Sequence, residues 1–274
     1  MKWLKLIIYD MRNGLLRKQY LYIPFIVCIP CILHLGICAQ LQISGGWMDY
    51  LLYCFRGIEP IILSDAASSF QLPIIWFITV CGCLFLNLDY PLNDLSHFGL
   101  QIIVRSNSRA MWYLSKCIWN IASCFLYICI ASLVCFLFAL FSGGPIAVQN
   151  TEGITAAAFA LSATFTLSGL KCLLMAAVCP FLTLCALSML QMLLSFLVKP
   201  VVGFLLCIGI LVLSLYLPSP AVIGNGAMTI RSSFLVKDGI DPLQSMIASI
   251  TIVFICTFVG TIYFQHKDVL GSDE

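Results

Sequence analysis

Long stretches without a charged residue are the feature that most constrains this chain. Windows free of Asp, Glu, Lys and Arg cover residues 19–48, 66–88, 117–151, 172–198, 200–230 and 242–266. A helix rises about 1.5 Å per residue, so roughly 20 apolar residues cross the hydrocarbon core of a bilayer. Only 9 % of the 274 residues are charged, whereas a soluble domain carries about 25 %. The chain is therefore predicted to be an all-α polytopic membrane protein.

These windows, trimmed at prolines and polar residues, predict six transmembrane helices. Their expected bounds are about 20–41, 72–88, 117–141, 172–198, 200–217 and 243–264. A further stretch, 154–170, is rich in Ala, Ser and Thr and only just long enough to cross. Counting Lys and Arg does not separate six spans from seven. We prefer six, with 154–170 as an external helix or an extension of the fourth span, and that choice rests on the family resemblance given below.

Residues 1–19 predict an amphipathic helix that lies in the membrane interface. Its apolar side chains recur at spacings of three and four: Trp3, Leu4, Ile7, Ile8, Met11 and Leu15. Lys and Arg lie mainly off this stripe and would reach the lipid headgroups. The alternative is a cytosolic leader packed on a partner. Five basic residues precede the first span, so the N-terminus is expected in the cytoplasm, and six spans would place the polar tail 267–274 there too.

The sequence lacks the common signatures of catalysis. No G-x-x-x-x-G-K-[ST] phosphate loop, H-E-x-x-H or G-x-S-x-G motif occurs, so we expect no enzyme activity and no metal or cofactor in this chain. Most of the 15 cysteines lie in apolar windows and are expected to pack as small hydrophobes, the pair Cys28 and Cys31 included. His34 is expected to be neutral and hydrogen-bonded. Asp89 and Lys171 are the charges nearest to bilayer depth, and both fall at span ends.

The connector 89–116 is the best candidate site. Its central segment combines a compact apolar face with a basic flank, formed by Leu95, Phe98, Leu100, Ile102, Ile103, Arg105 and Arg109. A short cytosolic helix of this kind is suited to dock in a groove on another protein. The alternative is a helix that lies on the membrane surface.

The second polar segment, 218–244, is broken by Pro and Gly, and we expect it either to re-enter the bilayer or to form an interfacial loop.

Together these elements resemble the permease subunit of an ABC transporter of the ABC-2 class, the type-2 exporter superfamily. The resemblance rests on the helix at 1–19, six spans, the connector with IIVRSNSRAMWYLSK, the tight turn at Lys199-Pro200, the broken loop before the last span, and the ending GTIYFQHKDVL. It covers nearly the whole chain and rests on architecture rather than on an invariant signature.

The resemblance implies a permease domain over 20–266 in a bacterial cell membrane, working with separate ABC ATPase subunits and a second permease, identical or homologous. ATP and Mg would bind to the ATPase. Residues 92–104 would be the coupling helix in the ATPase groove, with Arg105 and Arg109 at its edge. The exported cargo would be a peptide, an antibiotic or another amphipathic or lipidic molecule, and no nucleic acid is expected.

Two other functions stay open at this point. One is a non-transporting immunity or accessory protein that binds a toxic peptide. The other is a secondary carrier, which the scarcity of charges in the spans and the absence of visible internal repeats disfavour. Because the spans lack the acidic and basic relays of ion-coupled carriers, any active transport would draw its energy from a partner.

Overall fold

The computed structural model describes residues 2–60, 72–99, 109–160 and 166–266. Within these ranges the chain is helical and forms no β-strand. Five helical stretches are long and apolar enough to cross a membrane: Lys18–Leu41, Ile74–Asp94, Arg109–Phe141, Gly169–Leu197 and Pro242–His266. A sixth, Pro200–Tyr216, is apolar but shorter. The described residues therefore confirm the all-α fold with several membrane-length helices.

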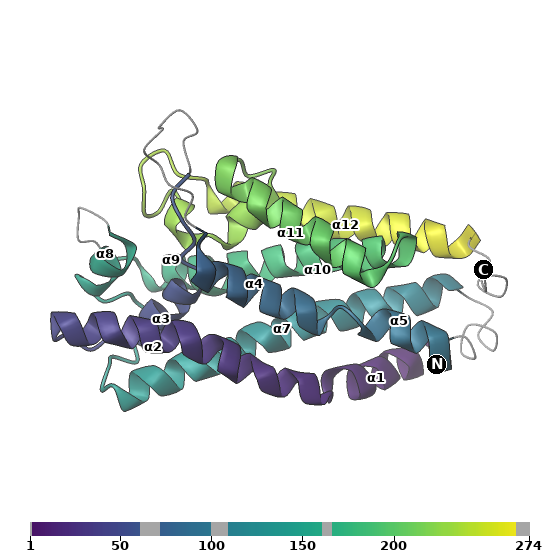
Figure 1. Cartoon of the computed structure of the whole chain (residues 1–274), viewed down its shortest axis with the longest axis horizontal. Coiled ribbons are helices and arrows are strands. Elements are labelled where there is room, and N and C mark those ends of the chain that lie inside the picture. The colour runs from purple at the N-terminus through teal and green to yellow at the C-terminus, as the bar shows by residue number, and fades with distance from the viewer. Residues whose placement is uncertain (1, 61–71, 100–108, 161–165, 267–274) are drawn as a thin grey trace.

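The long helices run along the long axis of the molecule (Figure 1). They are α2 (Ile23–Leu41), α4 (Ile74–Leu86), α7 (Arg109–Phe141), α10 (Cys179–Leu197), α11 (Pro200–Tyr216) and α12 (Pro242–His266). The N-terminal helix α1 (Lys2–Leu15) and the end of α12 lie at one end of this bundle, which we call the terminal end. The short helices α3 (Trp47–Cys54), α8 (Ile154–Phe159) and α9 (Gly169–Leu173) lie at the opposite end, the α3 end.

A helix of the bundle covers most of each expected span, but the bounds differ, most of all at the third. There α7 begins at Arg109 rather than near residue 117, and it has 33 residues. The difference arises because Lys116, the charged residue directly before the charge-free window 117–151, is buried inside the protein. The prediction assigns it to a solvated connector. The stretch 154–170 does not form one helix, since α8 has six residues, ends at Phe159 and is followed by Ala160 in the left-handed conformation.

Helix α10 is the central element of the bundle. It packs against α4, α7, α11 and α12, and most of its side chains are buried, whereas most of those of α12 are not. The outer helices instead expose large apolar side chains, among them Phe25, Ile29, Phe125, Leu133, Phe254 and Phe258. Soluble monomers rarely expose apolar surface on this scale. The exposed apolar surface of the outer helices is therefore suited to contact lipid.

Helix α1 packs on α7 with a face that the apolar stripe did not predict. Its buried positions are Leu6, Asp10 and Gly14, spaced four apart, whereas Leu4 and Ile8 of the stripe are more than half exposed. A Cβ atom at position 14 would overlap the indole ring of Trp119. Glycine therefore permits the close approach of the two helices, and the apolar stripe is left free to face lipid.

The middle of the segment between α11 and α12, residues 223–232, is mostly buried in the protein. It folds as two 3-10 turns, Ile223–Ala227 and Thr229–Arg231. The backbone N–H of Thr229 donates to the carbonyl of Phe55 at the end of α3, and the N–H of Ile230 donates to that of Arg56. These bonds satisfy two non-helical N–H groups inside the protein, so this part of the segment packs against the end of α3.

Candidate functional site

Three charged side chains meet inside the protein at the terminal end of the bundle. They are Asp10 of α1, Asp94 at the end of α5 (Tyr90–Asp94) and Lys116 of α7. The Nζ atom of Lys116 lies 2.5 Å from Oδ1 of Asp10 and 2.7 Å from Oδ2 of Asp94. Lys116 and Asp10 are fully buried and Asp94 nearly so. We call these three residues the ion cluster; through it one ammonium group joins three segments distant in sequence.

Two aromatic residues complete the ion cluster. The hydroxyl of Tyr90 donates to Oδ1 of Asp10 at 3.0 Å, and the indole N–H of Trp112 donates to Oδ2 of Asp94 at 3.1 Å. The ammonium of Lys116 also lies 4.8 Å from the centroid of the Tyr90 ring and 5.2 Å from that of Trp112. Such contacts stabilise a desolvated cation. The second oxygen of Asp10 has no hydrogen-bond partner in the described part of the chain.

The beginning of the connector is held against the spans beside the ion cluster. After Asp94 the chain continues as a π-helical turn, Leu95–Gly99, and a Cβ at Gly99 would crowd the Asp94 carbonyl at 2.7 Å. Leu95 packs against an aromatic cluster formed by Trp112, Tyr113, Phe196 and Phe264, which belong to α7, α10 and α12. A displacement of the turn would therefore be transmitted to three long helices.

The structure describes only part of the predicted docking face. Leu95 is half-buried against the aromatic cluster, so part of its side chain contacts this chain rather than a partner. Phe98 lies in the π-helical turn, but its side chain is outside the description. Arg109 is the first residue of α7 and is half-buried. The other predicted residues lie outside the described residues: Leu100, Ile102, Ile103 and Arg105.

Sequence reasoning missed the charges that the structure buries. Asp89 and Lys171, the charges predicted nearest to bilayer depth and at span ends, are half-buried and exposed respectively, and Nζ of Lys171 lies 5.2 Å from the centroid of the Phe234 ring. The buried charged residues in the described part of the chain include Asp10 and Lys116, which are fully buried. The available signal was the spacing of Asp10, four residues from both Leu6 and Gly14, which places an acid on a helix face with a small residue.

A polar layer lies next to the ion cluster, deeper in the bundle. The hydroxyls of Tyr20 and Ser123 lie 2.6 Å apart, and Ser123 donates to the side-chain oxygen of Asn87. The amide nitrogen of Asn87 donates to the hydroxyl of Ser188 at 2.9 Å. These residues join the start of the first span to α7 and α10 through buried hydrogen bonds, which specify one packing of the helices.

Residues 48–270 match the family described as a protein of unknown function, DUF2705. The chain belongs to the DUF2705 family. The match includes Asp94 and Lys116 but not α1 with Asp10. Neither a curated protein nor a solved structure matches this chain.

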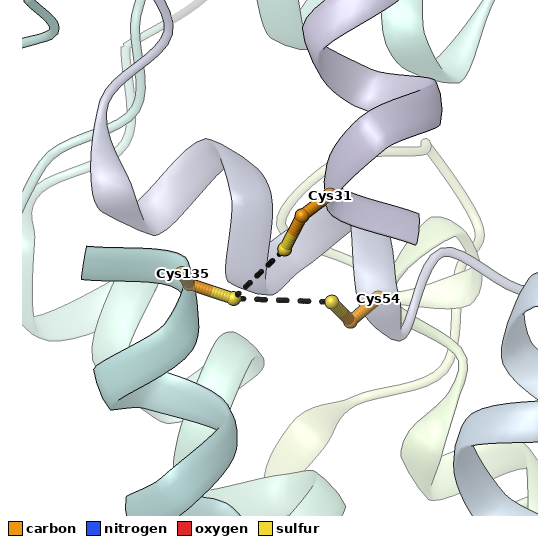
Figure 2. A group of neighbouring side chains, drawn as sticks. All are labelled: Cys31, Cys54 and Cys135. Atoms are coloured by element: carbon orange, nitrogen blue, oxygen red, sulfur yellow. Dashed lines mark hydrogen bonds between the residues drawn. The ribbon is translucent and has the colours of Figure 1, made fainter. Parts of the chain in front are cut away.

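A second cluster in this DUF2705 protein consists of three cysteines (Figure 2). Cys31 of α2, Cys54 at the end of α3 and Cys135 of α7 are free and fully buried, and their side chains point toward one another. The sulfur of Cys135 lies 3.8 Å from that of Cys31 and 3.9 Å from that of Cys54. The sequence predicted only hydrophobic packing here. It did not bring Cys31 together with partners from other helices.

His34 of this DUF2705 protein lies one turn beyond Cys31 on α2. It is fully buried, and its ring centroid lies 4.7 Å from that of Tyr50 and 4.9 Å from that of Tyr53. The hydrogen bond expected for this histidine is not found, because neither ring nitrogen has a partner among the described residues. The two tyrosine rings enclose the imidazole and leave its nitrogens without a polar group.

Proposed function

We propose that this protein is the permease subunit of an ATP-driven ABC-2 exporter in a bacterial cell membrane. The observation that carries the proposal is the double contact of Lys116 with Asp94 and Asp10. An exporter whose ATPase is a separate subunit needs a connector that moves together with the spans. The ion cluster ties the start of the connector to α7 and α1, which supports such a role.

The proposed topology has six spans with both termini in the cytoplasm. The spans would be Lys18–Leu41, Ile74–Asp94, Arg109–Phe141, Gly169–Leu197, Pro200–Tyr216 and Pro242–His266. An even number is supported because α1 and the end of α12 lie at the same end of the bundle (Figure 1). The basic residues of α1 and its C-terminal neighbours favour the cytoplasmic side for this end. The fifth span has 17 residues, about 26 Å of helix, which requires it to cross with little tilt.

Force would pass through this chain in two steps. ATP binding would close the partner ATPases and displace the connector after Gly99. Asp94 would then pull on α7 through Lys116, and on α1 through the same ammonium and Asp10. Because the ammonium is buried, its attraction to both carboxylates is screened less than it would be in water. The apolar, charge-poor spans favour an amphipathic peptide, an antibiotic or a lipidic molecule as cargo over a small ion.

The decisive experiment is purification of the tagged full chain from native membranes in a mild detergent. We expect a subunit that carries a G-x-x-x-x-G-K-[ST] loop, together with ATPase activity. The double variant Arg105→Glu/Arg109→Glu should lose this subunit, whereas Lys199→Glu, a charge reversal at the other proposed cytoplasmic turn, should retain it. Purification without such an ATPase, or association unaffected by the double variant, would refute the proposal and favour an accessory protein.

Topology is tested separately from partner association. A tag after Glu274 should be reached by an antibody only in permeabilised cells. A cysteine introduced at the exposed Gln149 should react with an impermeant maleimide on intact cells. A C-terminal tag that is accessible on intact cells would contradict the six-span topology.

A further inference from the structure

We propose that Cys31, Cys54 and Cys135 form a three-sulfur binding site for a thiophilic ion. A planar three-coordinate ion with metal–sulfur bonds of about 2.3 Å holds its sulfurs about 4.0 Å apart. Two of the three sulfur pairs are already at this separation, at 3.8 and 3.9 Å. The third pair lies within 4.8 Å and would shorten on binding. The inference does not depend on the proposed transport function.

The arrangement differs from cysteines that only fill space. Each sulfur comes from a different helix, and all three face a common point (Figure 2). The separations are far longer than a disulfide bond of about 2.0 Å, so no pair is bridged. Soft thiolate ligands select soft ions such as Cu(I), whereas hard cations prefer oxygen. The cluster therefore has the ligand type, number and spacing of a soft-ion site.

His34 supplies a second, independent observation beside the cysteine cluster. It is fully buried, and both its ring nitrogens lack a partner in the described residues, although an unsatisfied buried polar group costs about 1–3 kcal/mol. Cys31, His34 and Cys38 are spaced three and four apart, so they share one face of α2. A Cβ built on Gly45 would lie 2.9 Å from the Cys38 sulfur and 3.3 Å from Nε2 of His34. Cys31, His34 and Cys38 thus offer three metal-ligand side chains along one face of α2, from the cysteine cluster toward the α3 end.

Charge balance selects the ion. In a low-dielectric interior a neutral product is favoured over a charged one. Arsenous acid, As(OH)₃, reacts with three thiols by forming three As–S bonds and breaking three As–O bonds, and each thiol proton leaves with a hydroxide as water. The product is neutral and no atom changes oxidation state. Cu(I) with three thiolates would leave two negative charges, and Zn(II) prefers four ligands. Arsenic(III) carries a lone pair and binds three sulfurs as a pyramid, so it would draw the three sulfurs closer together than a planar ion does. Charge balance, rather than the present sulfur separations, therefore selects trivalent arsenic.

The test uses the reduced, metal-free full-length protein in detergent, titrated in parallel with arsenite, Cu(I) and Zn(II). Bound ion is counted per chain after gel filtration, and X-ray absorption reports the ligand atoms. We expect one arsenic per chain with three sulfur ligands and no net proton release. Cys31→Ser, Cys54→Ser and Cys135→Ser should each weaken binding at least tenfold, whereas Cys256→Ser, in a buried cysteine of α12, should not.

Thermal unfolding of each variant separates lost binding from lost folding, and a matching set of Cys→Ala variants repeats the test without the serine hydroxyl. Binding of Cu(I) but not arsenite by the same three residues would keep the three-sulfur site and overturn the charge argument. No binding of any ion by the wild-type protein would overturn the site itself. So would binding that the three cluster variants leave unchanged.

Discussion

The ammonium nitrogen of Lys116 lies 2.5 Å from a carboxylate oxygen of Asp10, although 106 positions separate the two residues in the chain. The contact joins the N-terminal helix to the start of α7, and Asp94 joins the same ammonium from the end of α5. One buried cation therefore holds together the segments on which the proposed coupling depends.

Removing the cation of the ion cluster should destabilise the protein strongly. Lys116→Met leaves Asp10 and Asp94 buried without their counter-ion, and we expect a loss of about 3–5 kcal/mol in the free energy of unfolding. Denaturant unfolding in detergent measures this loss. Lys199→Met, at an exposed lysine, should change stability by less than about 0.5 kcal/mol.

The double variant Asp10→Asn/Lys116→Met should lose less unfolding free energy than Lys116→Met, because one unpaired carboxylate has been removed. Equal stability of the two lysine variants would contradict the importance of the cluster.

The close packing of α1 on α7 should depend on Gly14. Gly14→Ala places a methyl group against the indole of Trp119, and overpacking of this kind costs about 1–3 kcal/mol. We expect faster proteolysis of the N-terminal helix and a lower unfolding temperature. Gly36→Ala is the matched control, since a Cβ at Gly36 meets nothing within 4 Å and Ala is the better helix former. Similar proteolysis of both variants would show that α1 does not need this contact.

The α3 end of the bundle should depend on Arg231. Its guanidinium is buried and donates to five carbonyl or amide oxygens in the described part of the chain, from Ile58, Glu59, Ser214, Leu215 and Asn225. Burial lowers the pKa of Arg231 to about 10. Arg231→Lys keeps the charge but cannot reach all five acceptors, and we expect a loss of about 2–4 kcal/mol in the free energy of unfolding.

Thermal unfolding of Arg231→Lys is the measurement, with Lys237→Ala as an exposed control in the same segment. A wild-type unfolding temperature for Arg231→Lys would mean that the charge alone is sufficient. In that case the geometry of the guanidinium fork would not matter at this position.

Asp49 of α3 should give stability a pH dependence. It is buried, and it accepts hydrogen bonds from the backbone of Gly46 and Thr151 and from the hydroxyl of Thr155. Burial is the larger effect and raises the pKa of Asp49 above its usual 3.8. The folded state therefore keeps its proton to higher pH than the unfolded state does. The contribution of Asp49 to stability falls as the pH rises from 3.8 through the folded pKa.

This dependence is measured as the difference in unfolding free energy between wild type and Asp49→Asn from about pH 4 to pH 7, the range in which a raised Asp pKa titrates. The advantage of the wild type should shrink as the pH rises. A difference that is constant across this range would contradict the prediction. An equal trend in Asp238→Asn, which makes the same change at an exposed side chain, would also contradict it.

The helices and their order follow from local patterns in the sequence. Charge-free windows, prolines and the Lys199-Pro200 turn predicted the positions of six apolar helices, because the length of a membrane helix and the cost of a charge in lipid are local properties. The same rule misplaced the start of α7. It treats every lysine as solvated, whereas Lys116 is neutralised by carboxylates from two other helices.

Which polar groups meet depends on how the helices pack in three dimensions. Asp10, Asp94 and Lys116 come together because α1, α5 and α7 pack at one end of the bundle, and Cys31, Cys54 and Cys135 meet because α3 inserts between α2 and α7. The spacing of apolar residues along one helix does not predict contacts between side chains of different helices. The energy of a buried ion pair or a sulfur cluster depends on the distance between atoms across helices, whereas the pattern of one helix reports only which of its own faces are apolar.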